Sequence, residues 1–361
     1  MVNYIDLIIA FFIALTLSFI LTFPVKRLAI RWGIVDKPNY RKIHKKVTPR
    51  FGGISIFLGS MVALLYLHPV NEHMTAIIYG AIVIIITGTL DDRYNIRPSI
   101  KLTGQFIAAS FLVSSGLIIE KVTLPFIGMV ELGFISVLVT VFWIVGITNA
   151  INLIDGLDGL ATGVSTIGLI SILIMAIIDS QLIVVYFSVV LIGANLGFLY
   201  HNYYPAKIYM GDTGSNYLGY MIAVISMLGL FKNVAILSFL IPIIILAVPI
   251  IDTLFAIARR LKNNESIMMA DNKHVHYQLL KFGFSHRVSV LIMYALSAVF
   301  GALAILFSKA SFALSFFIGL IVFFLVHILA ELTGLVLDGK RPVVDLILRM
   351  FKRRKRDKEK N

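Results

Sequence analysis

Residues 161–200 read ATGVSTIGLISILIMAIIDSQLIVVYFSVVLIGANLGFLY, in which two apolar runs flank the tripeptide Asp179-Ser180-Gln181. Each run has 18 or 19 residues, close to the roughly 20 apolar residues that a helix needs to cross a bilayer. A three-residue connection allows the second helix only to return beside the first. The stretch therefore predicts two antiparallel transmembrane helices.

Apolar runs of similar length fill most of the remaining chain. They cover residues 4–24, 51–69, 74–90, 102–119, 132–148, 214–230, 234–251, 289–307 and 312–335. Of the 361 residues, 59% are hydrophobic and 14% are charged, whereas soluble domains have roughly 45–50% apolar and about 25% charged residues. We therefore predict an all-α polytopic membrane protein with about 11 transmembrane helices. A single transmembrane domain over residues 1–337 precedes a basic cytoplasmic tail at 338–361, and residues 121–131 are expected to form a small hairpin.

The basic residues fall almost entirely on one side of this arrangement. An odd number of spans puts the termini on opposite sides, and 29 of the 32 Lys and Arg residues then share one side. The other side holds Lys121, Lys232 and Lys309. Because basic loops mark the cytoplasmic side, we predict an external N-terminus and a cytoplasmic C-terminus. The net charge of +13 is thus mainly a topology signal, and no nucleic-acid partner is expected.

The most specific polar motif is NAINLIDGLDGL at residues 149–160. An amide or carboxylate stands at every third position, namely at Asn149, Asn152, Asp155 and Asp158. A glycine follows each Asp and releases the backbone from a regular helix, so a partly unwound helix end is expected. Such an end could hold a nucleobase, a ribose or a metal shell. A simple helix stop would explain one Asp and one Gly, so we favour a functional role.

Asp91 and Asp92 close the third apolar run. Adjacent carboxylates repel each other and cost stability unless a cation, a base or water relieves them. A water-solvated pair at the membrane interface, with Arg93 as partner, explains this motif about as well as a functional site does.

A second acidic motif, YMGDTGS at residues 209–215, precedes the eighth run. Glycines on both sides of Asp212 allow the backbone to approach a phosphate or a hydrated cation closely. Asp212 or Thr213 could also be the N-cap of the following helix. Both roles are compatible, since a helix N-terminus favours an anionic ligand.

Two basic segments lie on the same cytoplasmic side. Residues 271–277 read DNKHVHY, and alternate side chains of an extended segment point the same way, which places His274 beside His276. That pair suits phosphate contacts as well as metal binding. Residues 41–53 read RKIHKKVTPRFGG and are either a positive-inside anchor or a segment whose Gly-Gly end approaches a ligand.

These motifs share one chemistry. The chain has no cysteine, which excludes disulfide frameworks, thiolate zinc sites and cysteine nucleophiles. Carboxylate and amide oxygens with nearby cations describe a magnesium site that handles phosphates. The residues therefore predict a membrane-embedded phosphotransfer enzyme with its active site on the cytoplasmic face.

In order and spacing, the motifs resemble those of the polyprenyl-phosphate N-acetylhexosamine-1-phosphate transferase family, from about Asp36 to the end of the chain. The resemblance implies eleven spans, a cytoplasmic Mg²⁺-dependent site, and transfer of a sugar-1-phosphate from a UDP-sugar to a polyprenyl phosphate with release of UMP. Ser285-His286-Arg287 and the ending that starts at Glu331 are similar to the bacterial branch that uses UDP-GlcNAc. That branch begins teichoic acid or related cell-envelope glycans at the plasma membrane.

The resemblance also implies roles for individual residues. Asp212 would hold Mg²⁺, for which Mn²⁺ could substitute, and Asp92 would support the metal. Asp91 would be the base on the lipid phosphate, and His274 and His276 would complete the catalytic set. The residues expected to bind substrate are Lys45, Asn149, Asn152, Asp155, Asp158, Asn202, Tyr209 and Arg287. Undecaprenyl phosphate would attack the β-phosphorus of UDP-GlcNAc directly, although a covalent Asp-phosphate route stays open. A homodimer is a further expectation.

Three alternatives are weaker. The peptidoglycan branch, which uses UDP-MurNAc-pentapeptide, usually carries three consecutive His, whereas this chain has His274-Val275-His276-Tyr277. Tyr277 also departs from many UDP-GlcNAc enzymes. A transporter would place its essential charges near the bilayer midplane, and an intramembrane aspartyl protease would need two aspartates within the bilayer. The acidic residues here gather at one face instead.

Overall fold

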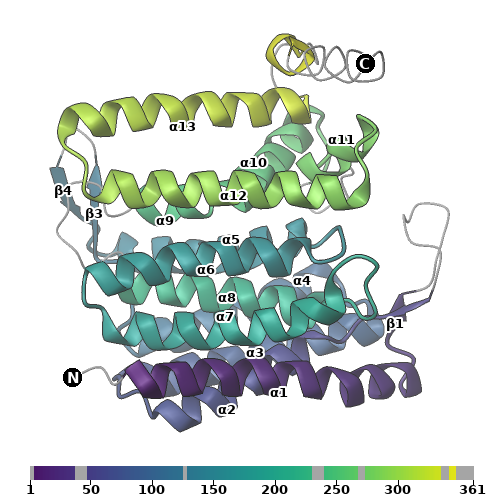
Figure 1. Ribbon diagram of the computed structural model, residues 1–361. Coiled ribbons are helices and arrows are strands. Elements are labelled where there is room, and N and C mark those ends of the chain that lie inside the picture. Colours follow the sequence, from purple (N-terminus) through teal and green to yellow (C-terminus); the bar gives the residue numbers. More distant parts are fainter. Residues whose placement is uncertain are drawn as a thin grey trace.

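A computed structural model describes residues 4–36, 47–124, 128–229, 240–266, 273–334 and 341–346. Within these residues the chain is a bundle of helices whose long axes run side by side (Figure 1). The helices are α1 (Tyr4–Arg31), α2 (Gly53–Leu67), α3 (Met74–Tyr94), α4 (Pro98–Ser114), α5 (Ile135–Ile154), α6 (Leu160–Ile178), α7 (Leu182–Asn202), α8 (Gly211–Gly229), α9 (Leu240–Ile245), α10 (Ala247–Lys262), α11 (Val275–Lys281), α12 (His286–Ser308) and α13 (Phe312–Thr333).

Each of the predicted apolar runs overlaps a helix. Within the described ranges, seven helices, namely α1, α3, α5, α6, α7, α12 and α13, are long and apolar enough to cross a membrane. The protein is therefore a helical, multi-pass membrane protein, while the count of eleven spans stays a prediction. The ninth run is divided between α9 and α10, because Pro249 has no N–H to donate to the carbonyl of Ile245, where α9 ends.

Two short antiparallel sheets are exceptions to the all-α expectation. The predicted hairpin is confirmed: β3 (Lys121–Leu124) pairs with β4 (Gly128–Glu131). The pairing of β1 (Val35–Asp36) with β2 (Thr48–Pro49) was not predicted. Two-residue strands are too short to leave an alternating pattern in the sequence.

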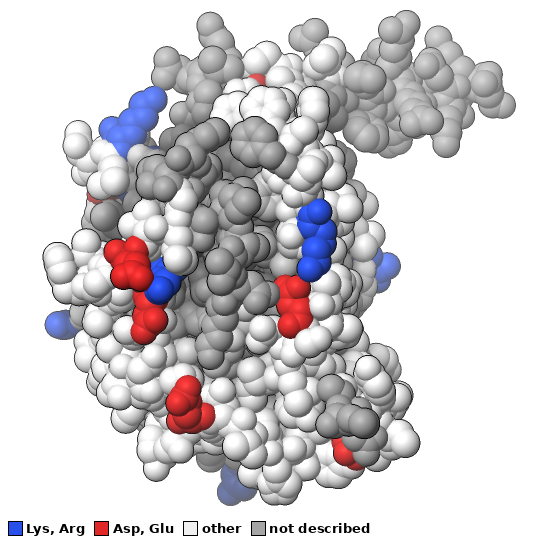
Figure 2. Space-filling model, turned by 90° about the vertical axis from the view of Figure 1, so that its left-hand side faces the viewer, with Lys and Arg blue, Asp and Glu red and all other residues white. Residues whose placement is uncertain are grey.

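The two sheets mark opposite ends of the bundle. The β3–β4 hairpin lies at one end, and β1 and α11 lie at the other (Figure 1). At the hairpin end, charged side chains are isolated spots on a surface that is otherwise mostly uncharged (Figure 2). The opposite end contains the acidic motifs and the described parts of the two basic segments, residues 47–53 and 273–277.

Small residues let the helices approach closely. At the α1–α7 contact, a Cβ atom on Gly197 would lie 2.2 Å from the carbonyl oxygen of Leu15, and one on Gly193 would lie 2.5 Å from that of Phe11. Membrane helices lack a strong hydrophobic drive to associate, so close backbone packing of this kind stabilises their contacts.

Candidate active site

Three carboxylates from two helices meet at the end of the bundle opposite the hairpin. Asp91 and Asp92 lie in the last turn of α3, and Asp212 lies in the first turn of α8. The side chain of Asp92 is fully buried, whereas those of Asp91 and Asp212 are 10% and 17% exposed. Asp91 and Asp212 are therefore the carboxylates that a ligand can reach.

Asp92 holds the start of α8 in place. One carboxylate oxygen accepts from the backbone N–H of Asp212 at 2.9 Å, and the other accepts from the N–H and the hydroxyl of Thr213 at 3.0 and 2.6 Å. Gly88, one turn earlier on α3, makes room, because a Cβ atom there would lie 2.5 Å from the Cα of Thr213. Asp92 thus satisfies N–H groups that have no partner within the helix.

Two basic residues that the sequence did not identify as site residues sit among these carboxylates. The guanidinium of Arg50 contacts Asp92 at 3.0 Å and Asp212 at 3.3 Å. The ammonium of Lys101, on α4, contacts Asp212 and lies 3.4 Å from Asp91. The two cations thus offset much of the negative charge of the three carboxylates. The available signal for Lys101 was its position at the edge of an apolar run, where a charge is costly.

A short extended segment places Arg50. The N–H of Tyr209 donates to the carbonyl of Pro49 at 2.8 Å, and the N–H of Gly52 donates to the carbonyl of Tyr209 at 3.0 Å. Gly53 N–H then donates to Met210 at 2.9 Å. These bonds fasten the segment before α2 to the segment before α8, which explains how residues 162 positions apart meet.

The motif at 149–160 unwinds as predicted, since α5 ends at Ile154 and α6 begins at Leu160. Its two amides contact other helices. Asn149 donates to Gln105 of α4 at 2.6 Å, and Asn152 donates to the hydroxyl of Ser215 at 2.8 Å. Both therefore join α5 to its neighbours at the site.

The two acidic residues of the motif differ in environment. Desolvation, and then the negative charge of Asp212, raise the pKa of Asp155 to about 8. Asp158 accepts from the backbone N–H of Ala206 at 2.9 Å, while its own N–H donates to the imidazole of His286 at 3.0 Å. Asp158 thus connects its own segment with the loop before α8 and with the start of α12. Among the described residues, the carboxyl of Asp155 makes no comparable connection.

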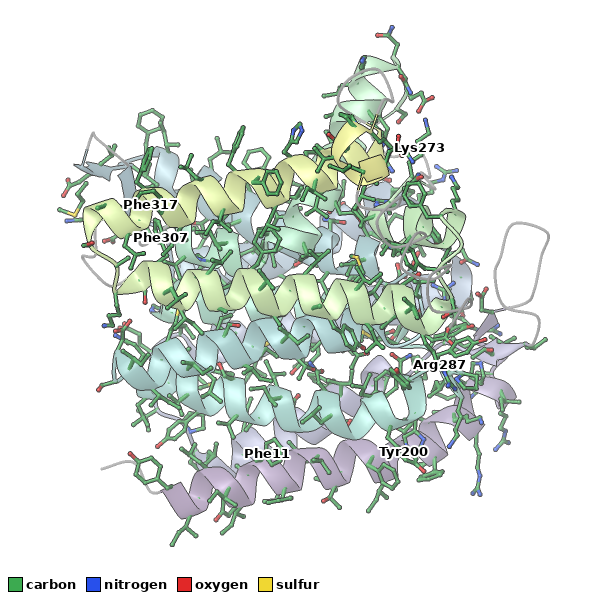
Figure 3. The ribbon with its side chains drawn as sticks, turned by 45° about the horizontal axis from the view of Figure 1, so that its top comes forward. Phe11, Tyr200, Lys273, Arg287, Phe307 and Phe317 are labelled. Atoms are coloured by element: carbon green, nitrogen blue, oxygen red, sulfur yellow. The ribbon has the colours of Figure 1, made fainter. Side chains whose placement is uncertain are left out.

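Beside Asp158, aromatic and basic side chains from two segments stack. The rings of Tyr204 and His286 are 4.3 Å apart, and the guanidinium of Arg287 lies 5.6 Å from the centre of the Tyr204 ring. Figure 3 shows Arg287 and Lys273 at this end of the bundle, with Phe307 and Phe317 at the opposite end. Arg287 is therefore at the site end, as predicted.

Asn202 and Tyr209 organise the loop before α8. Asn202 accepts from the hydroxyl of Thr162 at 2.8 Å and donates to the carbonyl of Ile208 at 3.0 Å. Burial, with the charge of Asp158, raises the pKa of Tyr209 to about 12. Tyr209 therefore stays protonated at neutral pH and can donate a hydrogen bond.

The predicted histidine pair lies at the start of α11, with the two rings 5.8 Å apart and nearly parallel. Asp252 of α10 accepts from His274 at 2.9 Å and from the N–H of Val275 at 3.0 Å. His276 is fully buried, and neither of its ring nitrogens has a hydrogen-bond partner among the described residues. A Cβ atom on Gly156 would lie 2.2 Å from its Nε2, so the histidine segment packs on the 149–160 motif.

The donor set fits a hard divalent cation. Among the described residues, no group of three or more His, Asp or Glu side chains is arranged to hold an ion. Asp91 and Asp212 nevertheless face the same ammonium group, so both can face one cation. Mg²⁺ is usually bound by one or two carboxylates, with phosphate oxygens and water as its other ligands. The predicted residue Lys45 lies outside the described residues.

Comparison with known proteins gives a consistent result. Residues 74–230 match the model of glycosyl transferase family 4. A probable undecaprenyl-phosphate N-acetylglucosaminyl 1-phosphate transferase of Bacillus subtilis is 46% identical over 351 residues, 97% of this chain and 98% of the relative. A decaprenyl-phosphate N-acetylglucosaminephosphotransferase of Mycobacterium tuberculosis is 36% identical, with 81% of each chain covered. An undecaprenyl-phosphate alpha-N-acetylglucosaminyl 1-phosphate transferase of Escherichia coli is 27% identical over 80% of this chain and 81% of the relative.

Proposed function

Because the chain belongs to glycosyl transferase family 4 and, within it, to the polyprenyl-phosphate N-acetylglucosamine-1-phosphate transferases, we propose that it transfers GlcNAc-1-phosphate from UDP-GlcNAc to undecaprenyl phosphate. An oxygen of the lipid phosphate forms a bond to the β-phosphorus. The bond from that phosphorus to the bridging oxygen breaks, and UMP leaves. The product is undecaprenyl-diphosphate-GlcNAc. The chain is a multi-pass enzyme of the bacterial plasma membrane.

The observation that carries this proposal is the cluster of Asp91, Asp92 and Asp212 with Arg50 and Lys101 at one end of the bundle. Phosphoryl transfer needs charge neutralisation and positioning more than covalent chemistry from the protein. The first N–H groups of α8 are already taken by Asp92, so Arg50 and Lys101 are the groups that would meet the phosphates. A lipid phosphate anchored in the membrane can reach groups at this depth.

The metal belongs to the same proposal. Asp212 and one oxygen of Asp91 would hold Mg²⁺, with Mn²⁺ as a substitute, while the other oxygen of Asp91 stays available as the base. Asp92 would support the ion by fixing the start of α8. When bound, the ion would neutralise charge on the phosphates during transfer. Asp212→Asn keeps the shape of the side chain but removes the charge, so it tests this assignment directly.

The chain's own residues supply the remaining steps. Asp91 accepts the proton of the lipid phosphate, and Arg50 and Lys101 neutralise phosphate oxygens. Asp155 and Tyr209 form the wall on which the uridine binds, and buried Asn202 holds the loop that carries Tyr209. A protonated Asp155, with its pKa near 8, can donate a hydrogen bond to a uracil carbonyl or to a ribose oxygen. Arg287 contacts phosphate or sugar oxygens, while the buried pair His274 and His276 acts from behind the 149–160 motif.

Several finer expectations complete the proposal. They are eleven spans with an external N-terminus, an active site facing the cytoplasm, and a product that enters teichoic acid or related glycan synthesis. The distribution of 29 of 32 basic residues on one side supports the orientation. The homodimer stays a prediction.

Release of UMP by purified protein tests the activity. The assay combines detergent-solubilised protein with undecaprenyl phosphate and, in separate reactions, UDP-GlcNAc, UDP-GalNAc or UDP-MurNAc-pentapeptide. We expect UMP and a GlcNAc-bearing lipid only with UDP-GlcNAc. Turnover with the pentapeptide substrate would instead indicate the peptidoglycan branch, and absence of UMP with every donor would support a transporter.

A further inference from the structure

Two polar side chains that have not been given a role lie one helical turn deeper in the membrane than the carboxylate cluster. They are Gln105 of α4, which is 2% exposed, and Asn216 of α8, which is 4% exposed. Gln105 follows Lys101 by four residues and Asn216 follows Asp212 by four, so each pair shares one helix face. The contact between Lys101 and Asp212 is thus repeated one turn deeper by Gln105 and Asn216.

The hydrogen bonds form a continuous path between three helices. The carbonyl of Gln105 accepts from Asn149 of α5 at 2.6 Å. The amide nitrogen of Gln105 lies 3.4 Å from the carbonyl oxygens of both Asn149 and Asn216. Asn216 in turn donates to the backbone carbonyl of Asp212 at 2.8 Å. The path therefore ends on the backbone of Asp212.

Two backbone carbonyls fix the direction of this path. A carbonyl can only accept, so Asn216 must turn its NH₂ group toward Asp212 and its oxygen toward Gln105. At the other end, Asn149 donates to the carbonyl of Val145 at 2.8 Å. Gln105 must then present its NH₂ group to Asn216. A side chain of the same shape that lacks this donor would put two acceptors face to face, which is unfavourable at a buried site.

Bonding of this kind is more than the local fold requires. Each amide has a high desolvation cost in an apolar bundle, and apolar side chains could pack α4 against α5 and α8 without it. The path instead ties the backbone of Asp212 to two neighbouring helices. We propose that Gln105 is a positioning residue, which through Asn216 and Asn149 holds Asp212 at the distance from Asp91 that a shared divalent cation requires. This inference rests on the proposed function.

The sharpest test compares two substitutions at the same position. Gln105→Glu keeps the shape but replaces the NH₂ donor by a negatively charged acceptor, whereas Gln105→Asn keeps the donor on a shorter side chain. We expect Gln105→Glu to lower kcat by about 10–100-fold, since small displacements of catalytic groups have effects of this size, and to leave the KM for UDP-GlcNAc within about threefold. Gln105→Asn should recover part of the loss. Asn216→Ala should have a similar effect, and the double variant should be no worse than the more damaging single variant.

Binding of Mn²⁺, followed by electron paramagnetic resonance without substrates, gives a readout independent of turnover. Gln105→Glu and Asn216→Ala should both weaken Mn²⁺ binding. Ser226→Ala is the matched control, because Ser226 accepts a buried hydrogen bond from Trp143 at 2.9 Å between the same helices α5 and α8. It should lower the melting temperature without changing Mn²⁺ binding.

The outcomes separate the two proposals. If the wild-type protein releases no UMP, the proposed function fails. If the wild type is active and binds Mn²⁺, but Gln105→Glu and Ser226→Ala lower stability equally and leave Mn²⁺ binding and kcat unchanged, the positioning role is overturned. A stable Gln105→Glu variant with weak Mn²⁺ binding supports it.

Discussion

The adjacent residues Asp91 and Asp92 have different surroundings, so substitutions at the two positions should differ in their effects on activity and melting temperature. Asp92→Asn replaces one oxygen by an NH₂ group, which cannot accept from the N–H groups at the start of α8. We expect lower activity and a melting temperature lowered as for loss of a helix cap, which costs about 1 kcal/mol or more. Asp91→Asn should retain the wild-type melting temperature.

Asp91→Asn should instead lose turnover in a pH-dependent manner. The second pKa of a phosphate is about 6, so the lipid phosphate loses its own proton as pH rises. A general base contributes about 10²–10⁴-fold, and the loss should shrink between pH 6.5 and pH 8.5. Turnover equal to the wild type at pH 6.5 would show that Asp91 is not the base. UDP-GlcNAc affinity by calorimetry is the control and should be unchanged.

Asp212 should be the least replaceable of the carboxylates. Asp212→Ala is expected to abolish UMP release, and Asp212→Asn to be nearly as damaging, because an amide has the shape but not the charge that a cation needs. Thermal unfolding with and without Mg²⁺ provides the binding readout. Stabilisation of Asp212→Ala by Mg²⁺ to the wild-type extent would contradict the assignment.

Buried His276 should make the protein acid-labile. Desolvation lowers its pKa to about 4, whereas the pKa in an unfolded chain is about 6.5. Between these values the unfolded chain takes up a proton that the folded chain does not, so stability is present above pH 6.5 and is lost as pH falls toward 4. The loss is on the order of 3 kcal/mol.

Melting temperatures at pH 7 and pH 4.5 measure this effect, with His276→Phe as the comparison. The variant keeps an aromatic ring but cannot be protonated, so its melting temperature should fall less between the two pH values. An equal fall in both proteins would show that another group is responsible.

Site residues could be predicted from the sequence where the polar side chains stand together in a short motif. Asp91, Asp212 and His274 stand in such motifs, and the structure brings them to the same end of the bundle. Arg50 and Lys101 could not be identified in this way, because Arg50 meets carboxylates 42 and 162 positions away and Lys101 meets Asp212 111 positions away. A basic residue in a basic loop has many explanations until the fold shows which carboxylate it faces.

At the scale of the elements, the contact between the start of α2 and the start of α8 depends on two glycines. A Cβ atom on Gly53 would lie 2.1 Å from the backbone nitrogen of Gly214, and backbone cannot move aside as a flexible side chain can. We expect Gly53→Ala to destabilise the protein by about 1–3 kcal/mol or more and to lower activity, because Arg50 lies three residues away.

A glycine with free space is the matched control for this substitution. In the part of the chain that the structure describes, no atom lies within 4 Å of the position of a Cβ atom on Gly146 of α5, so Gly146→Ala should leave the melting temperature and UMP release unchanged or slightly higher. If both variants behave like the wild type, α2 and α8 are not in close contact at this point.

The helices themselves could be predicted because about 20 apolar residues in succession have few alternatives in a membrane. Their ends were less predictable. Helix α4 was expected at 102–119 and is found at Pro98–Ser114, since Pro98 is favoured in the first turn of a helix. Because Ser99 and Lys101 are polar, the run of apolar residues begins after the true start of the helix.

For the whole molecule, the decisive prediction is orientation. The chain has no native cysteine, so single cysteines can be introduced at Ser180, in the turn between α6 and α7, and at Asn263, at the end of α10. We expect a membrane-impermeant maleimide to label Ser180→Cys in intact cells and Asn263→Cys only after permeabilisation. The reverse pattern would place the candidate site outside the cell and contradict the proposed function.

The general architecture was accessible from sequence because hydropathy and charge asymmetry report directly on the bilayer. The order of helices in space was not. Contacts such as α1 with α7 and α3 with α8 depend on where small residues allow close approach, and many glycines in the chain could serve. Short loops predict sequential neighbours, whereas the site is built from helices that are distant in the sequence.

The cap that Asp92 provides for α8 also has a consequence for biosynthesis. The N–H groups that it accepts from belong to residues 120 and 121 positions later in the chain. At roughly 5–20 residues per second, a ribosome needs about 6–24 s to make the intervening segment. During that interval α3 is in the membrane with a carboxylate that must stay hydrated or be shielded by the insertion machinery. In a nascent chain that stops before α8, the carboxylate of Asp92 has no N–H groups of α8 to accept from. This unpaired carboxylate is a chemical feature by which membrane quality control can recognise such chains.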